Sequence, residues 1–429
     1  MIELRTGNLP PGSKIRALRH PGEAPGGAAL ARPVPVLFVH FGDSDIRGSE
    51  QQLLDLLGAL DRSRYHPVLW CNGEALAEAA RALDVTTHRT PLAFFFSASS
   101  SAFQWRTWWE QLRVARALVA QHGIRLLHAN SGAPVQWLMP VARSLRLPVL
   151  AHLHAPYLRR DRLVLLLHQA ALAVGVSRAT TEGLLADGMT SARVRLIPNG
   201  IDPARLRPLR PGALRAELGI PAEDLVIGSV GSLITRKGPD VLLAAFARLA
   251  HPSAWLILAG SGPERERLEA MTDALGVAPR VRFVGNVEEP GVVYDAMDIH
   301  VLASRSEAFG LVLVEAALSG VPNIGSAVGG IPEVIDDERT GLLVPPDDAE
   351  ALAGALGRLA RDPGLRARLA VAGHEDAEAR FTVSRMARDL SAAYDELLAI
   401  PPAQLGWGAA IRQDGGTYLR ALPQFARRA

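Results

Sequence analysis

The 429 residues of this chain exceed one ordinary hydrophobic core and suit two domains of about 150–200 residues each. Apolar residues make up 48% of the chain and charged residues 21%, which indicates a globular and not a disordered protein. The formal net charge of +2 gives no support for nucleic-acid binding, because a basic face does not follow from a near-balanced total.

The chain has one cysteine, Cys71, which excludes an intrachain disulfide and a cysteine-rich metal site. The N-terminus has no apolar core of signal-peptide length, and the longest apolar runs, such as 163–167, are too short to span a bilayer. We therefore expect a cytoplasmic protein. Lys14 and Lys237 are the only lysines, so the predicted folded region has just one, by chance or for function.

Residues 1–33 are rich in Pro, Gly and Arg and predict a loose arm. From 34 to 203, short apolar runs alternate with amphipathic stretches, as in βαβ units with a parallel sheet. The predicted strands are 36–41, 67–71, 124–128, 149–154, 172–176 and 194–197. The predicted helices are 51–60, 74–83, 105–121, 135–145, 163–170 and 180–186.

The Pro-Asn-Gly-Ile-Asp-Pro sequence at 198–203 predicts a linker, after which the alternation restarts over 204–382. Strands are predicted at 226–230, 255–259, 281–284, 299–303 and 322–324, with a further apolar segment at 341–344. Helices are predicted at 241–250, 265–275, 291–297, 310–319, 349–359, 365–379 and 383–398. The expected fold is therefore α/β, with two Rossmann-like doubly wound domains that face one interdomain cleft.

The strongest local signal runs from Ser304 to Glu315, where a strand ends and a helix begins near Gly310. A helix N-terminus presents free N–H groups that suit anions and sugar hydroxyls. Glu307 precedes the helix, whereas Glu315 lies among apolar positions and needs a polar partner. The two carboxylates could bind the diols of a sugar and a ribose. The alternative is a helix-dipole charge plus one surface glutamate.

A second signal is the pair Arg236-Lys237, which follows a glycine-containing loop and precedes a helix. The guanidinium fork and the ammonium point charge together suit a diphosphate. Cations at a helix N-terminus are disfavoured without an anion, so the pair favours an anion site over a solvated helix start.

The first half has no G-x-G-x-x-G and no Walker A sequence, so a dinucleotide cofactor is not supported. Gly48 still lies where the backbone could approach a phosphate at a helix start. His152 and His154 would share one face of a strand. No third ligand is evident near them, so we expect no bound metal, and a structural hydrogen bond is the alternative role for His154.

Several motifs together resemble the retaining glycosyltransferases of family 4, over roughly residues 35–398. They are Glu307-x7-Glu315 around Phe309-Gly310, Arg236-Lys237, Gly329-Gly330-Ile331-Pro332-Glu333, Asn199-Gly200-Ile201-Asp202 and Gly341-Leu342-Leu343-Val344. The resemblance implies the GT-B fold, in which residues 383–429 would supply a helix that returns to the first domain, followed by a tail. Where the family usually has two glycines, this chain has Arg47-Gly48.

The resemblance also implies a role for each matching residue. Arg236 and Lys237 would bind the donor diphosphate, Glu307 the sugar hydroxyls, and Glu315 the ribose diol. Gly48 would approach the phosphates, and His154 would lie near the reacting sugar carbon. The amides of Phe309, Gly310 and Leu311 would lie by the sugar and phosphate, and Asn286 and Val287 would border the base.

The implied function is the retaining transfer of a hexose-type sugar from a nucleoside-diphosphate sugar to a glycan, lipid-linked or small-molecule acceptor. It fits bacterial polysaccharide biosynthesis and needs no cofactor or metal, because the cation pair can neutralise the leaving group. The alternatives are a non-catalytic nucleotide-sugar-binding partner and a nucleotide-sugar epimerase.

A cluster of aromatic residues in the first half suggests peripheral contact with the inner face of a membrane. Phe94-Phe95-Phe96 and the aromatic residues of 103–109 lie near Arg106 and Arg113, and Trp and Arg are favoured at bilayer interfaces. The alternative is that Trp105 and Trp108 face the core, while Trp109 packs on a neighbour or lines the acceptor cleft.

Overall fold

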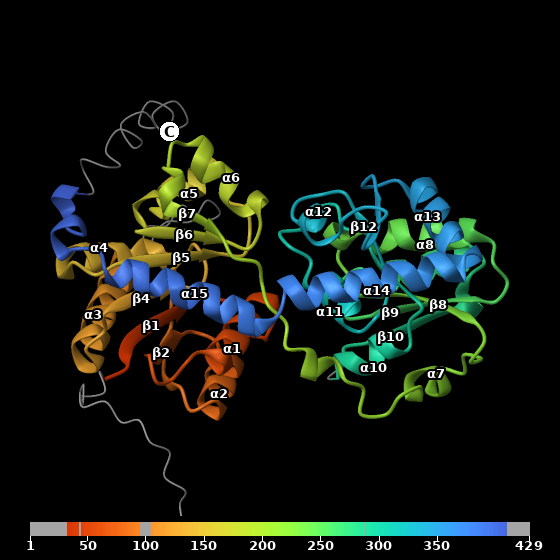
Figure 1. The fold of residues 1–429 in the computed structure, drawn as a ribbon, viewed down its shortest axis with the longest axis horizontal. Coiled ribbons are helices and arrows are strands. Elements are labelled where there is room, and N and C mark those ends of the chain that lie inside the picture. The colour runs from red at the N-terminus through yellow and green to blue at the C-terminus, as the bar shows by residue number, and fades with distance from the viewer. Residues whose placement is uncertain (1–31, 43, 95–103, 288, 410–429) are drawn as a thin grey trace, which may run out of the picture.

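The structure is a computed structural model that describes residues 32–42, 44–94, 104–287 and 289–409. Two α/β domains lie side by side, and the C-terminal helices run along both of them (Figure 1). All but the last two residues of the expected N-terminal arm lie outside the described residues, as does the tail beyond 409.

The first domain is built on a seven-stranded sheet in the order β3-β2-β1-β4-β5-β6-β7, in which every neighbouring pair is parallel. Buried parallel strands are apolar on both faces, as in β1, where only the first two residues are partly exposed. The strands are β1 (Val34–His40), β2 (Tyr65–Cys71), β3 (Thr86–Arg89), β4 (Leu126–Ala129), β5 (Val149–Leu153), β6 (Leu172–Gly175) and β7 (Val194–Leu196).

The second domain has a six-stranded parallel sheet in the order β10-β9-β8-β11-β12-β13. Its strands are β8 (Leu225–Val230), β9 (Ala254–Ala259), β10 (Val281–Gly285), β11 (Ile299–Leu302), β12 (Asn323–Ser326) and β13 (Gly341–Val344). Both sheets reverse their strand order beside the first strand of the domain. Such a switch point is where doubly wound sheets bind ligands.

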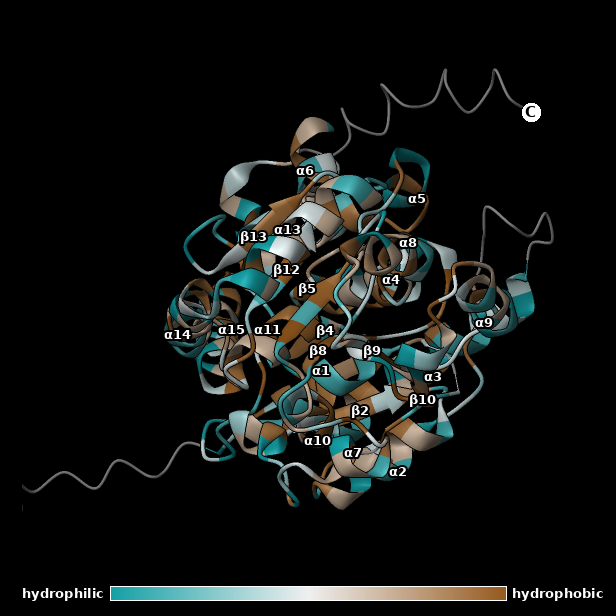
Figure 2. Ribbon diagram, turned by 90° about the vertical axis from the view of Figure 1, so that its right-hand side faces the viewer, coloured by the Kyte–Doolittle hydropathy of each residue, from teal (hydrophilic) through white to brown (hydrophobic). Residues whose placement is uncertain are grey.

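Helices cover both faces of each sheet, and the mainly brown strands of Figure 2 lie between helices that carry both brown and teal residues. In the first domain these are α1 (Gly48–Ala59), α2 (Glu74–Ala82), α3 (Trp105–His122), α4 (Val135–Leu145), α5 (Arg159–Val164) and α6 (Arg178–Ala186). In the second they are α7 (Ala213–Glu217), α8 (Pro239–Leu249), α9 (Arg265–Ala274), α10 (Pro290–Asp295), α11 (Leu311–Leu318), α12 (Ile331–Val334), α13 (Ala349–Arg361) and α14 (Pro363–Arg380).

The last helix, α15 (Val383–Leu398), packs on the first domain beside α1. The Tyr65 hydroxyl donates to Asp395 Oδ1 over 2.6 Å and anchors this helix to β2. The two chain crossings between the domains run next to each other, because Ile201 pairs with Thr382 in a parallel bridge. A Cβ at Gly200 would lie 2.5 Å from the Thr382 carbonyl oxygen, so the crossing requires glycine there.

The predicted α/β class and the alternation of elements are confirmed, although the short helices α7 and α12 were not predicted and the first domain differs from the prediction at two further places. The predicted helix at 163–170 is wrong: α5 ends at Val164, Leu166 adopts a left-handed φ of 60°, and a 3-10 turn follows at Leu167–Gln169. A leucine run does not by itself separate a helix from a turn that packs on the core. Strand β3 was not predicted, because an edge strand of sequence TTHR has no apolar run.

Candidate active site in the interdomain cleft

The carboxyl ends of both sheets face a cleft of about 660 Å³ between the domains. The loops after β1 and β5 form the first-domain wall, and the loops after β8 and β11 form the opposite wall. The predicted residues Gly48, His154, Arg236, Lys237, Glu307, Phe309, Gly310 and Leu311 all line this cleft. The fold thus brings together side chains that lie up to about 260 positions apart in the sequence.

The two predicted cations meet Glu307 on the second-domain wall. Lys237 Nζ lies 2.5 Å from Glu307 Oε2, and Arg236 Nη1 donates to the Ser306 carbonyl over 2.8 Å. The side chains of Lys237 and Glu307 are only 20% and 11% exposed, so the ion pair is held in a fixed geometry. The pair presents a cation and a carboxylate next to each other, as a sugar diphosphate requires.

The loop before α11 owes its shape to close backbone packing. Gly310 caps the helix with a left-handed φ of 96°. A Cβ at Gly329 would lie 1.8 Å from the Glu307 carbonyl oxygen, and a Cβ at Gly330 would lie 2.2 Å from that of Ala308. Because Gly329 and Gly330 have no side chains, their loop packs directly on the backbone of Glu307 and Ala308. The N–H groups at the start of α11 are thereby left facing the cleft.

Glu315 lies one turn into α11, outside the residues that line the cleft in this structure. Its Oε2 accepts a hydrogen bond from the Tyr294 hydroxyl over 2.6 Å, which confirms that this carboxylate needs a polar partner. Burial raises the pKa of Glu315, and the Tyr294 hydrogen bond opposes that shift. The alternative of an ordinary surface glutamate is wrong.

A second chamber of about 650 Å³ adjoins the cleft and shares Gly48, Gly231 and Ser232 with it. Asn286 and Val287 line this chamber after β10, together with the loop at 260–263. Asn286 and Val287 are the residues that the resemblance places beside a nucleotide base, and that role stays a prediction.

Gly48 brings the two domains into contact at the base of the cleft. It is the first residue of α1, and a Cβ built on it would lie 3.1 Å from Leu311 Cδ1 at the start of α11. The N-termini of two helices thus converge from opposite domains, and both dipoles favour an anion between them.

His154 lines the cleft at the end of β5, and its ring lies 4.3 Å from that of His152, which confirms that they share one face. Burial and the neighbouring His152 hold the pKa of His154 well below its usual range, so the ring is neutral. Its Nε2 lies 3.1 Å from Asn130 Oδ1. Within the described ranges, no group of three or more His, Cys, Asp or Glu residues could hold a metal ion.

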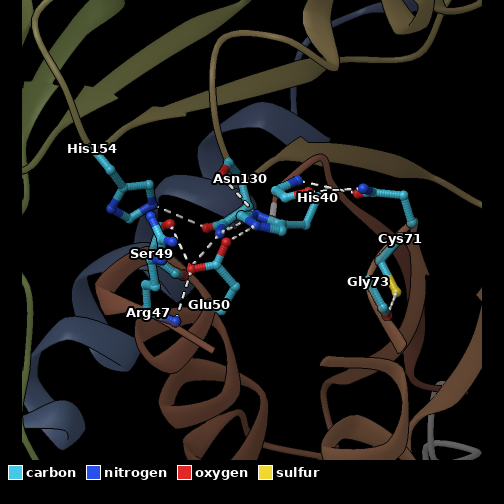
Figure 3. Close-up of polar contacts among 10 residues, drawn as sticks. His40, Arg47, Ser49, Glu50, Cys71, Gly73, Asn130 and His154 are labelled. Carbon is cyan, nitrogen blue, oxygen red and sulfur yellow. Dashed lines mark hydrogen bonds and ion pairs between the residues drawn. The ribbon is translucent and has the colours of Figure 1, made fainter. Parts of the chain in front are cut away.

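Sequence reasoning did not predict three features of this site. One is the polar chain behind His154, shown in Figure 3. The others cross the domain boundary: the Ser177 hydroxyl donates to the Ala308 carbonyl over 2.5 Å, and the Arg178 N–H donates to Glu333 Oε1 over 2.8 Å. For the contact between Arg178 and Glu333, the Gly-Gly-Ile-Pro-Glu motif pointed to Glu333. Nothing in the sequence indicated that Arg178 would be its partner.

The aromatic cluster is only partly within the described residues, since Phe95, Phe96 and Phe103 lie outside them. Trp105 is 52% exposed, so the expectation that it faces the core is wrong. Trp108 packs against the first-domain core, as that interpretation expected, and Trp109 is 57% exposed. Among the helices described, none is both long enough and apolar enough to cross a bilayer.

Two facing Rossmann-like domains with one cleft between them define the GT-B fold class. A sucrose-phosphate synthase from Thermosynechococcus elongatus superposes with a TM-score of 0.72 at 26% identity, over 85% of this chain and 99% of that one. Anabaena HepE, solved with UDP and glucose, gives a TM-score of 0.72 at 23% identity, over 84% of this chain and 99% of that one.

Family models match both halves of the chain. Residues 46–205 match the model described as Glycosyltransferase Family 4, and residues 212–376 match the model described as Glycosyl transferases group 1. The chain therefore belongs to the glycosyltransferases of family 4.

Curated relatives that match this chain include bacterial glycosyltransferases. A D-inositol 3-phosphate glycosyltransferase of Corynebacterium jeikeium is 40% identical over 228 residues, which are 50% of this chain and 54% of that protein. The lipopolysaccharide core biosynthesis glycosyltransferase LpsE of Rhizobium meliloti is 38% identical over 188 residues, which are 44% of this chain and 54% of LpsE. The chain thus spans about half the length of the curated relatives it matches.

Proposed function

We propose that this chain transfers a hexose from a nucleoside-diphosphate sugar to an acceptor hydroxyl, with retention of the anomeric configuration. The observation that carries the proposal is the cleft in which Lys237 and Glu307 face the helix N-terminus at Gly48. A dianionic leaving group and a polyhydroxylated sugar are the ligand parts that this combination of charges and N–H groups suits.

In the proposed reaction, the acceptor oxygen attacks the anomeric carbon from the face on which the diphosphate leaves. The bond from that carbon to the phosphate oxygen breaks, and the acceptor proton passes to the departing phosphate. Arg236, Lys237 and the N–H groups of α11 stabilise the negative charge that develops on the leaving group. Glu307 accepts hydrogen bonds from sugar hydroxyls and orients the ring.

The most informative experiment is a panel of donors assayed for nucleoside diphosphate release, with UDP-glucose first because HepE shares the fold and has been solved with it. Candidate acceptors are inositol phosphates, lipopolysaccharide core sugars and lipid-linked glycans, the first two following the named relatives. Product anomers identified by NMR test retention. Donor binding without turnover on any acceptor would favour the non-catalytic partner, and a donor converted to its epimer would favour the epimerase.

We expect turnover to survive a strong chelator, because Arg236 and Lys237 neutralise the diphosphate without a metal. Initial rates would be compared in EDTA and in magnesium or manganese. We expect the rates in EDTA and in either metal to agree within about twofold. Loss of a contact to the diphosphate would lower the rate by more than that. Loss of activity in EDTA that manganese restores would show that the reaction needs a metal.

We propose that the exposed tryptophans of α3 bind an anionic membrane surface, with Arg106 stacked on the Trp105 ring. The Trp105→Ala/Trp109→Ala variant should lower co-sedimentation with phosphatidylglycerol liposomes by about tenfold or more, since each ring buries a large apolar area. The matched control is Trp407→Ala, an exposed tryptophan on another part of the first domain. Equal sedimentation of both variants and the wild type would exclude this surface from membrane contact.

A further inference from the structure

A continuous chain of polar side chains runs from a buried carboxylate to the cleft (Figure 3). Glu50 Oε1 lies 2.7 Å from His40 Nε2, and His40 Nδ1 lies 3.1 Å from Asn130 Nδ2. Asn130 Oδ1 lies 3.1 Å from His154 Nε2. Glu50, His40 and Asn130 are almost completely buried, although Glu50 and His40 also border the cleft, and His154 is the most exposed of the four. His154 is therefore the member of the chain best placed to meet a ligand.

The position of Asn130 determines where the hydrogens lie. Its Nδ2 donates to the Ser49 carbonyl oxygen over 3.2 Å, so the amide nitrogen lies on the side of α1 and Oδ1 lies toward His154. Because an amide oxygen can only accept, His154 Nε2 must carry the proton. A neutral imidazole has a single N–H, so His154 Nδ1 is left as a lone-pair acceptor. Figure 3 shows that second nitrogen turned away from Asn130.

Glu50 is the anchor of the chain. Burial raises its pKa, but the hydrogen bond and charge of His40 outweigh burial and, with further hydrogen bonds, bring the pKa of Glu50 to about 2. The ionised carboxylate also accepts from the Arg47 N–H over 3.2 Å and from the Ser49 hydroxyl over 3.0 Å. A carboxylate with so low a pKa is a poor general base, which argues for a role in orientation.

Glu50 also fixes the orientation of the His40 ring. The carboxylate accepts the Nε2 hydrogen, which turns the Nδ1 edge of the ring toward Asn130. Nδ1 also lies 3.2 Å from the Asn130 carbonyl oxygen. A proton on Nδ1 donates to that carbonyl and holds the Asn130 backbone in place, while the Asn130 amide donates to Ser49.

Gly42 shows that the fold makes room for the Glu50–His40 contact. A Cβ at position 42 would lie 2.3 Å from Glu50 Oε1 and 2.5 Å from His40 Nε2, directly beside their contact. The Gly42 backbone is held over them by Asn72, whose side chain bonds both its N–H and its carbonyl at 3.1 and 2.8 Å. Any side chain larger than hydrogen would force the pair apart.

We infer that Glu50 is a positioning residue that acts through His40 and Asn130 to hold His154 as the Nε2–H tautomer. His154 Nδ1 is then fixed as a hydrogen-bond acceptor at the cleft, where the group it meets must be a donor, such as a sugar hydroxyl. The identity of that ligand rests on the proposed function. The tautomer does not, because it follows from contacts between residues of the protein itself.

The test is NMR of protein labelled with 15N at histidine, with the His154 signals assigned from a His154→Gln variant. The wild type should show one neutral tautomer of His154, protonated on Nε2. In Glu50→Gln and Gly42→Ala the 15N shifts should move toward values averaged over both tautomers. The matched controls are Glu74→Gln, an exposed carboxylate in the first turn of α2, and Gly58→Ala, a position on α1 with no atom within 4 Å of an added Cβ. Both should keep the wild-type spectrum.

Kinetics separate positioning from a general structural role. Glu50→Gln should lower kcat about tenfold, the effect of one misplaced hydrogen bond, while UDP affinity should fall by less, because the cations at the diphosphate, Arg236 and Lys237, belong to the second domain. Glu50→Asp, which keeps the charge, should recover part of the rate. Protonation of wild-type His154 on Nδ1, or an unchanged tautomer in Glu50→Gln, would overturn the inference. Absence of turnover with any donor would reject the proposed function and leave the NMR result standing.

Discussion

Lys237→Ala should lower the rate of sugar transfer by about 10- to 150-fold, the effect of losing one charge-assisted contact of about 1.5–3 kcal/mol. The reason is that Lys237 faces the cleft at the start of α8, where no other lysine can replace it. Arg236→Ala should reduce the rate within the same range. Steady-state kinetics with saturating donor measure both losses.

The same substitution has a structural consequence that a control must separate. Lys237 is the 2.5 Å partner of Glu307, which is only 11% exposed, so Lys237→Ala leaves that poorly solvated carboxylate with Arg236, at 3.7 Å, as its remaining cation. Adding Glu307→Gln should recover thermal stability but not the rate. Arg248→Ala, an exposed cation at the far end of α8, is the matched control and should behave as the wild type. A near-normal rate for Lys237→Ala would reject the diphosphate assignment.

Glu315→Gln should weaken the binding of free UDP by about tenfold or more, because hydrogen bonds to a charged acceptor contribute about 1.5–3 kcal/mol. Glu315 lies beside the cleft and not among its lining residues, so this variant tests directly whether the carboxylate contacts the ribose. Isothermal titration calorimetry without acceptor measures the affinity independently of catalysis.

The pH dependence of the same binding supplies a second measurement. Burial raises the pKa of Glu315, so the carboxylate takes up a proton at a higher pH than an ordinary glutamate does. The acceptor form is lost as pH falls through that raised pKa, and the affinity difference between wild type and Glu315→Gln should shrink. Tyr294→Phe, which removes the 2.6 Å hydrogen bond, should show a smaller loss at neutral pH. Equal UDP affinities for wild type and Glu315→Gln would exclude the ribose role.

The regular elements were predictable because their signal is local. Buried parallel strands such as β1 are continuous apolar runs, and helices such as α4 and α15 match their predicted bounds at both ends. The errors lie where that signal fails: β3 is a polar edge strand, and the leucines of 163–170 pack on the core in a broken helix.

The sequence by itself determined the α/β class and the motifs that belong to one strand end, such as Arg236-Lys237 and Glu307 before α11. Only the tertiary structure decided which of these groups meet. Glu50 reaches His154 through Asn130, 80 positions along the chain, and Arg178 meets Glu333 from the other domain. The periodicity of apolar residues predicts which face of a helix or strand is buried. Which residue a buried side chain contacts depends on the strand order in the sheet and on how the two domains dock. Those contacts are set by packing between distant segments, which no local pattern encodes.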